Sequence, residues 1–152
     1  MHIYVREFIE SDRKALRLLF LSSRNTAFAR SPAGSRRLED FDVSTQGEKI
    51  LVALNQFEPV GFASIWEPDN FLHHLFVHPE FQGCGVGKAL LNACEKYFSS
   101  AATLKCLQVN ERAKKFYLSQ NWFVHSEGES DDGPYFVMVQ GNLPNKSLER
   151  TA

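Results

Sequence analysis

Three glycines alternate along the short stretch Gln82-Gly83-Cys84-Gly85-Val86-Gly87-Lys88. The stretch follows an apolar run typical of a strand and precedes a helical pattern that begins at about Val86. Glycines at such a junction let the main chain adopt conformations closed to other residues and come close to a ligand. Several backbone N–H groups then point outward at the positive end of a helix, which suits a phosphate or diphosphate. The same turn is also compatible with a tight connection that holds no ligand.

Two common nucleotide-binding patterns do not fit this turn. A Walker A loop needs a serine or threonine after its lysine, whereas Lys88 is followed by Ala89. A Rossmann dinucleotide fingerprint needs G-x-G-x-x-G near the first strand, whereas these glycines alternate in the middle of the chain. The spacing that remains is Q/R-x-x-G-x-G/A.

Two segments of the chain carry a family resemblance. Leu75–Leu91, which contains the glycine turn, resembles motif A of the Gcn5-related N-acetyltransferases (GNAT). Val109–Phe123 resembles motif B of the same family, whose usual form is N-x-x-A-x-x-F-Y-x-x-x-G-F. Asn121 and Trp122 replace the usual glycine and phenylalanine, and both suit a helix end followed by an aromatic plug. With both motifs in the family's order, the chain is similar to small bacterial members over nearly its whole length.

The resemblance implies that acetyl-CoA is the acetyl-donor cosubstrate. The glycine turn would hold its diphosphate, and the preceding strand would pair with its pantetheine arm. The resemblance also implies that motif B contributes contacts to the cofactor. The cofactor-binding residues expected on this basis are Leu75, Phe76, Val77, Gln82, Gly83, Cys84, Gly85, Val86, Gly87, Lys88, Asn110 and Phe116.

The activity that the resemblance implies is direct transfer of an acetyl group to a primary amine of a small molecule, peptide or protein. Tyr117 stands where family members commonly have a general acid for the departing CoA thiolate, and a phenol has a proton to give. A partly buried core aromatic is the alternative role for this residue. A non-catalytic acyl-CoA-binding or sensory module is the alternative function.

His73 is the candidate general base. It lies nine positions before Gln82, where some relatives of the family have a glutamate, and an imidazole is apt near neutral pH. Because neighbouring strand residues face opposite ways, we expect only one of His73 and His74 to point into a given cleft. His74 as the base and deprotonation through ordered water are the alternatives. We expect no metal, because His73, His74 and His78 lack helical spacing and no acid is placed among them.

The composition bounds the partners and the location. The chain has 152 residues, a formal net charge of −1 and a sequence pI of about 6.5. Because there is no basic field, we expect neither nucleic acid nor a membrane as a partner. The three cysteines cannot all pair within the chain, and free thiols favour a reducing compartment. With no basic-then-apolar leader, we expect a cytoplasmic protein. As to its oligomeric state, we expect a monomer or a homodimer.

The elements expected along the chain make one domain over residues 1–141, followed by a polar tail at 142–152. Periodicity predicts helices capped by Ser11-Asp12 and by Asn110, one over about Val86–Phe98, and a further short helix opening at Arg36. The predicted strands are Ile3–Ile9, Lys49–Leu54, Val60–Trp66, Phe71–His78, Thr103–Val109, about Trp122–Glu127 and Tyr135–Val139.

This order of elements fits a mixed sheet with helices on both faces, an α/β (α+β) fold. The resemblance implies a mostly antiparallel sheet of about seven strands that is splayed between its fourth and fifth strands. The loops at 25–42 and 127–134 are expected to line the acceptor site.

Overall fold

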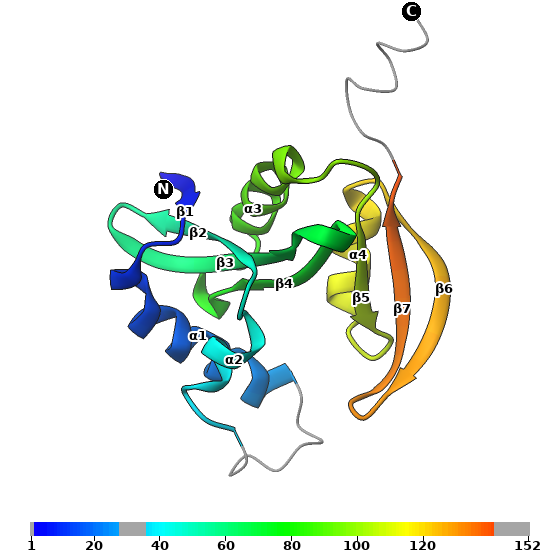
Figure 1. Cartoon of the computed structure of the whole chain (residues 1–152), viewed down its shortest axis with the longest axis horizontal. Coiled ribbons are helices and arrows are strands. Elements are labelled where there is room, and N and C mark those ends of the chain that lie inside the picture. Colours follow the sequence, from blue (N-terminus) through cyan, green and yellow to red (C-terminus); the bar gives the residue numbers. More distant parts are fainter. Residues whose placement is uncertain (1, 28–35, 142–152) are drawn as a thin grey trace, which may run out of the picture.

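The computed structural model describes residues 2–27 and 36–141, so the expected tail and part of the 25–42 loop lie outside the described residues (Figure 1). Short 3₁₀ helices at Glu10–Asp12, Glu67–Asp69, Pro79–Phe81 and Glu95–Tyr97 join the main elements. Those elements are, in chain order, β1 (Ile3–Glu7), α1 (Arg13–Ala27), α2 (Asp40–Ser44), β2 (Lys49–Asn55), β3 (Glu58–Trp66), β4 (Phe71–Val77), α3 (Val86–Cys94), β5 (Thr103–Leu107), α4 (Glu111–Ser119), β6 (Trp122–Ser130) and β7 (Gly133–Gln140).

The strands of the described chain form one seven-stranded sheet in the order β1-β2-β3-β4-β5-β7-β6. Neighbouring strands run antiparallel except for β4 and β5, which are parallel. Within the described residues, β4 and β5 share one residue pair, Phe71 with Thr103, and then separate. This arrangement confirms the expected fold class, including the splay between the fourth and fifth strands.

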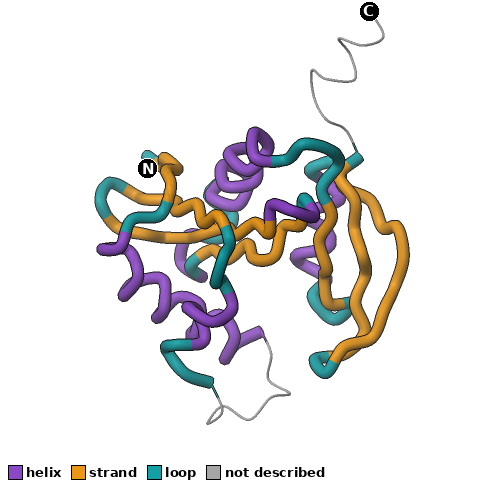
Figure 2. The backbone as a smooth tube through the Cα atoms, in the orientation of Figure 1, coloured by secondary structure: helices purple, strands orange, loops and turns teal. Residues whose placement is uncertain are grey.

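Helices cover both faces of the sheet, as expected (Figure 2). On one face α3 and α4 pack into a core that contains Val86, Leu90 and Tyr117. On the other face α1 and α2 enclose an aromatic core around Phe20, Phe41 and Phe62. Edge-to-face contacts join Phe41 to Phe20 and to Phe62, with ring centroids 6.2 and 5.3 Å apart. The sequence has 13 phenylalanines, and three of them are buried in this second core, with Phe8 and Phe76 packed against it.

Most predicted elements are confirmed, with differences at their ends. β2 and β3 are longer than predicted and are joined by Gln56-Phe57, where Gln56 has a positive φ of 59°. The hairpin β6–β7 also extends further, because Ser130 and Gly133 still pair. The short helix predicted to open at Arg36 is wrong in position. It begins at Asp40, whose carboxylate accepts a hydrogen bond from the backbone N–H of Arg37.

Asp12 ties β1 to the start of α1 in a way that differs from the predicted N-cap. Its carboxylate accepts hydrogen bonds from the Arg6 guanidinium at 2.8 and 3.0 Å and from the backbone N–H of Ile9 at 2.9 Å. The side chain is 4% exposed. Burial alone would raise the pKa of Asp12, but Arg6 and the Ile9 N–H outweigh burial and hold that pKa below its usual value.

We expect Asp12→Asn to destabilise the protein by about 1–3 kcal/mol, because a buried charge-assisted pair is lost. Since the pKa of Asp12 is lowered by folding, its contribution is fully present above the unfolded value of 3.8 and is lost as the pH falls through the folded pKa. Urea unfolding at several pH values measures both effects. The control Glu10→Gln alters a solvent-exposed carboxylate, and a loss as large there would contradict the role given to Asp12.

Candidate active site

β4 and β5 pair at one end and diverge towards the other, and the opening between them is called the wedge here. Asn70, directly before β4, fixes its closed end. Its main-chain oxygen accepts a hydrogen bond from the backbone N–H of Thr103 at 3.1 Å. Its side chain accepts one from the backbone N–H of Ser99 at 2.9 Å and donates one to Ser100. Asn70 has φ 50°, a left-handed conformation that asparagine tolerates. The two strands are therefore joined at this end and diverge towards Val77.

Beyond Phe71, the edge of β4 that faces β5 carries main-chain groups that pair with no strand of the described structure. The N–H of His78 bonds the carbonyl oxygen of Val60 on β3 at 2.8 Å. Because antiparallel partners alternate along a strand, the N–H groups of Val77 and Leu75 then point away from β3, towards the wedge. Unpaired strand groups of this kind can accept an extended amide ligand, as in β-augmentation.

The glycine turn lies beyond the open end of the wedge. Gly83 and Gly85 have φ values of 80° and 87°, a region that favours glycine, and Gly85 is the N-cap of α3. At this end of the helix, the Ala89 N–H donates a hydrogen bond to the Gly85 oxygen at 3.0 Å. The N–H groups of Val86, Gly87 and Lys88 precede that bond and are free for an anion.

Helix α4 forms the opposite wall. Asn110 caps it as predicted, since its side-chain oxygen accepts a hydrogen bond from the Ala113 N–H at 3.1 Å. Phe116 faces Gly87 on α3, where an added Cβ would lie 3.2 Å from the Phe116 ring. Glycine at 87 thus serves close packing between the two helices. At the helix end Asn121 has the predicted left-handed conformation, with φ 70°.

Between these parts lies a cleft of about 480 Å³. It brings together most of the residues predicted from the two motifs, and its lining includes Leu75, Phe76, Val77, Gln82, Gly83, Gly85, Gly87, Lys88, Asn110, Phe116 and Tyr117. Cys84 is exposed in the turn, and Val86 is buried in the core beneath it, so neither side chain lines the cleft. Sequence reasoning missed the lining residues Pro79, Phe81, Arg112 and Ala113. The position of Arg112 within motif B, two residues after the cap, was the available signal.

Tyr117 reaches the cleft from the buried face of α4. It is 8% exposed and packs against Phe116 and Trp122, with ring centroids 5.3 and 5.9 Å away. Burial, and to a lesser extent the nearby thiols of Cys106 and Cys94, raises the pKa of Tyr117 well above its usual range. The phenol therefore keeps its proton at neutral pH and is able to donate it.

His73 and His74 lie on the same side of the sheet, so the prediction that they face opposite ways is wrong. Ser64 pairs with His74 and Ile65 with Leu72, which leaves His73 as an extra residue in a β-bulge. The two imidazoles are stacked with centroids 3.8 Å apart. His78 is separate from this pair, and its Nδ1 accepts a hydrogen bond from the backbone N–H of Glu80.

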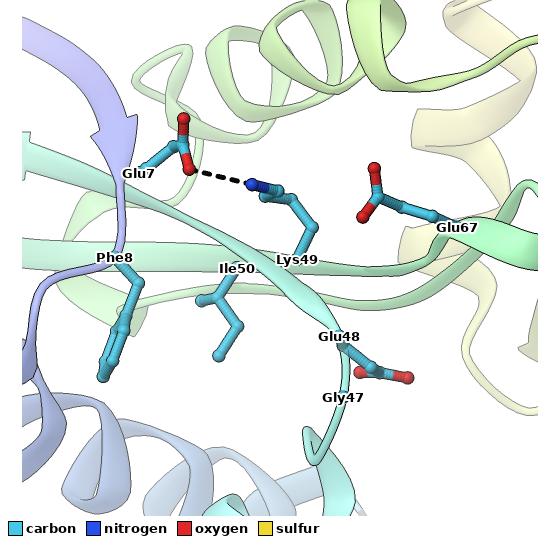
Figure 3. Close-up of a pocket in the computed structure, with 7 residues that line it drawn as sticks. All are labelled: Glu7, Phe8, Gly47, Glu48, Lys49, Ile50 and Glu67. Atoms are coloured by element: carbon cyan, nitrogen blue, oxygen red, sulfur yellow. Dashed lines mark hydrogen bonds and ion pairs between the residues drawn. The ribbon is translucent and has the colours of Figure 1, made fainter.

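The expectation that no acid accompanies these histidines is also wrong. Glu48, directly before β2, brings its Oε2 to 2.7 Å from His73 Nδ1. The candidate ligand atoms of Glu48, His73 and His74 all lie within 4.8 Å of one another. Figure 3 shows Glu48 leaving the chain on the opposite side from Lys49, which pairs with Glu7. Glu48 and Lys49 both line a hollow of about 350 Å³, whose lining residues differ from those of the cleft.

The cysteines are free, as predicted. Burial raises the pKa of Cys94 to about 12 and also raises that of Cys106. Neither thiol is therefore a nucleophile at neutral pH, because the thiolate is the reactive form.

Comparison with known proteins decides the family. The model of the acetyltransferase (GNAT) family matches residues 13–122. This chain belongs to the GNAT family. An uncharacterised N-acetyltransferase of Archaeoglobus fulgidus is 34% identical to this GNAT protein over an alignment of 92 residues, and the match covers 52% of this chain. The match spans 63% of the length of that relative.

Solved structures share the GNAT fold of this chain. YjaB from Escherichia coli has a TM-score of 0.75 at 24% identity, over 92% of this chain and 98% of its own. The PaiA N-acetyltransferase of Thermoplasma acidophilum was solved in complex with coenzyme A. It has a TM-score of 0.75 at 20% identity, over 93% of this chain and 100% of its own. In the described part of the GNAT chain, none of the helices has the length and apolar character needed to cross a membrane.

We expect Gly85→Ala to weaken acetyl-CoA binding. The added Cβ meets nothing within 4 Å in the described structure, so the cost is the left-handed backbone, about 1–2 kcal/mol. Relaxation of the turn would then misdirect the free N–H groups, and calorimetry should show a Kd raised by about tenfold. Gly133→Ala, at φ 119° in the β6–β7 hairpin, is the matched control and should leave the Kd unchanged. Equal weakening in both variants would exclude a local role for the turn.

Proposed function

We propose that this protein transfers an acetyl group from acetyl-CoA directly to a primary amine of a small molecule, peptide or protein. One observation carries the proposal: the free N–H groups of the glycine turn, the open edge of β4 and the Tyr117 phenol all border one cleft. A diphosphate, an extended amide chain and a departing thiolate are the three parts of acetyl-CoA that these features suit.

The path of the cofactor follows from the wedge. With the diphosphate at the N-terminus of α3, the pantetheine arm would run along β4 from Val77 towards His73. That distance is about 13 Å at the usual rise of a strand. Lys88 and Arg112 line the cleft and offer positive charge to the phosphates. The thioester would then lie at the narrow end of the wedge, close to the β-bulge.

The wedge also lets the two reactants approach from different faces. Phe76 lines the cleft, yet its ring packs 5.5 Å from Phe20 and 5.6 Å from Phe62 in the core of the other face. Acetyl-CoA would enter on the side of α3 and α4. The amine would approach on the side of α1 and α2, where the bulge presents His73.

In the reaction, His73 takes a proton from the ammonium form of the acceptor, and the neutral amine attacks the thioester carbonyl. The C–N bond forms, the C–S bond breaks, and the departing thiolate receives the proton of Tyr117. The attacking nitrogen, which still carries two protons, releases one of them to solvent to give the amide. The Tyr117 phenolate takes a proton back from solvent. Lack of an acid near the position of the base would favour the non-catalytic alternative. Glu48 beside His73 supplies a carboxylate there, which favours the enzyme.

The free thiols favour a reducing compartment, and we propose the cytoplasm as the location.

Tyr117→Phe tests the proposed function. We expect kcat to fall by about 10²–10⁴-fold, because the general acid is lost, while acetyl-CoA binding is retained. A thiol-release assay with alkylamines, polyamines, aminosugars and peptides measures turnover, and calorimetry measures binding. Tyr97→Phe is the matched control, since its hydroxyl bonds Glu7 outside the cleft. Full activity of Tyr117→Phe would exclude the acid role, and no acetylation of any amine by the unmodified protein would contradict the proposed function.

A further inference from the structure

The pair formed by Glu48 and His73 has a geometry that the proposed reaction does not by itself require. Glu48 Oε2 lies 2.7 Å from His73 Nδ1, a short contact for a charge-assisted hydrogen bond. The Glu48 side chain is 6% exposed, whereas His73 is 36% exposed. One nitrogen of the imidazole is thus held by a buried carboxylate, while the ring retains a solvent-facing edge.

Within the described chain, the Glu48 carboxylate makes its hydrogen bond to His73. Its second oxygen, Oε1, is buried and has no hydrogen-bond partner among residues 2–27 and 36–141. Burying a carboxylate with an unsatisfied oxygen is costly, and a nearby group that carries a proton or a positive charge offsets that cost. Glu48 therefore favours a proton on His73 Nδ1.

His74 fixes the plane of the His73 ring. Its Nε2 is 2.7 Å from Ser44 Oγ, and its ring packs edge-on against Phe20 at 5.2 Å. The His73 ring lies on it at 3.8 Å with 26° between the planes. With its face on His74 and Nδ1 on Glu48, the His73 ring is held by two neighbours, and Nε2 is the nitrogen left for a ligand.

A shared metal ion is the competing use of Glu48, His73 and His74. An imidazole lone pair lies in the plane of its ring, so two ligands must direct their ring planes at one point. Rings that are stacked 3.8 Å apart and tilted by 26° send their lone pairs along separate, nearly parallel planes. A common ion would require at least one ring to turn and to give up the stacking contact. The observed arrangement therefore favours hydrogen bonding over metal binding.

We propose that Glu48 is a positioning residue, which holds His73 in the Nδ1–H tautomer and leaves the Nε2 lone pair to accept the proton of the acceptor ammonium. This inference rests on the proposed function, in which His73 is the base. As the proton moves from the ammonium nitrogen to Nε2, the resulting imidazolium lies beside the Glu48 carboxylate. The carboxylate stabilises it without itself being protonated, as in the acid–histidine pairs of hydrolases.

The tautomer is tested first, on the free protein and without any substrate. Nitrogen-15 NMR of histidine-labelled protein distinguishes a protonated ring nitrogen from one with a lone pair. We expect neutral His73 to carry its proton on Nδ1, and Glu48→Ala to shift the population towards the Nε2–H form. Ser44→Ala, which removes the partner of His74 only, is the matched control and should leave the His73 tautomer unchanged. An Nε2–H form in the unmodified protein would overturn the proposal.

Turnover is tested next, with the best acceptor from the amine panel. We expect His73→Asn to lower kcat by about 10²-fold or more and Glu48→Gln by about tenfold or more, with the Kd for acetyl-CoA unchanged in both. An unaltered kcat in Glu48→Gln would overturn the positioning role. Melting curves confirm that the variants are folded. If no amine is acetylated, the proposed function fails, but the NMR result still decides the tautomer.

Zinc titration separates the hydrogen-bonded pair from a metal site. Added Zn²⁺ should leave the nitrogen signals of His73 and His74 unchanged at one equivalent. A stoichiometric shift of both rings that disappears in Glu48→Gln would show that the three residues form a metal site, and it would overturn the proposal.

Discussion

The main-chain groups that β4 and β5 leave unpaired are the constraint on which the rest of the structure depends. The two strands pair at Phe71 and Thr103 and then separate. The N–H and C=O groups beyond that pair must find another partner or remain solvated. Asn70 holds the closed end, and the parallel direction of β5 sends the chain on to α4, which walls the open end. The cleft is therefore a property of the sheet itself, and an extended amide ligand would complete the interrupted pairing.

The β-bulge at His73 places two imidazole rings at the narrow end of the same wedge. One extra residue in β4 turns both histidines towards α1 and α2, while Leu75 and Val77 continue on the side of α3. In the proposed reaction, the strand would contact the cofactor on one face and the acceptor on the other within a few residues. Ser44 and Glu48, on either side of the turn between α2 and β2, reach the two rings from one segment. A single local irregularity thus joins the two halves of the proposed reaction.

The sequence predicted those parts of the site that depend on local chemistry. The left-handed glycines, the Asn110 cap and the left-handed Asn121 all follow from residue type and near neighbours. The bulge could not be predicted, because it exists only in the register between β3 and β4. The approach of Glu48 to His73 joins residues 25 positions apart and depends on that bulge. Asp12 was placed correctly at the start of a helix, but its bond to Arg6 required the position of β1.

Hydrogen exchange of the β4 amides, measured by NMR with and without acetyl-CoA, tests most directly whether the open strand edge is a cofactor-binding edge. In the free protein the N–H groups of Leu75 and Val77 should exchange faster than that of Phe76, which faces β3. Saturating acetyl-CoA should slow Leu75 and Val77 by about tenfold or more and change Phe76 less. Equal protection of all three amides in the free protein, or no slowing at Leu75 and Val77 when acetyl-CoA is bound, would contradict this description.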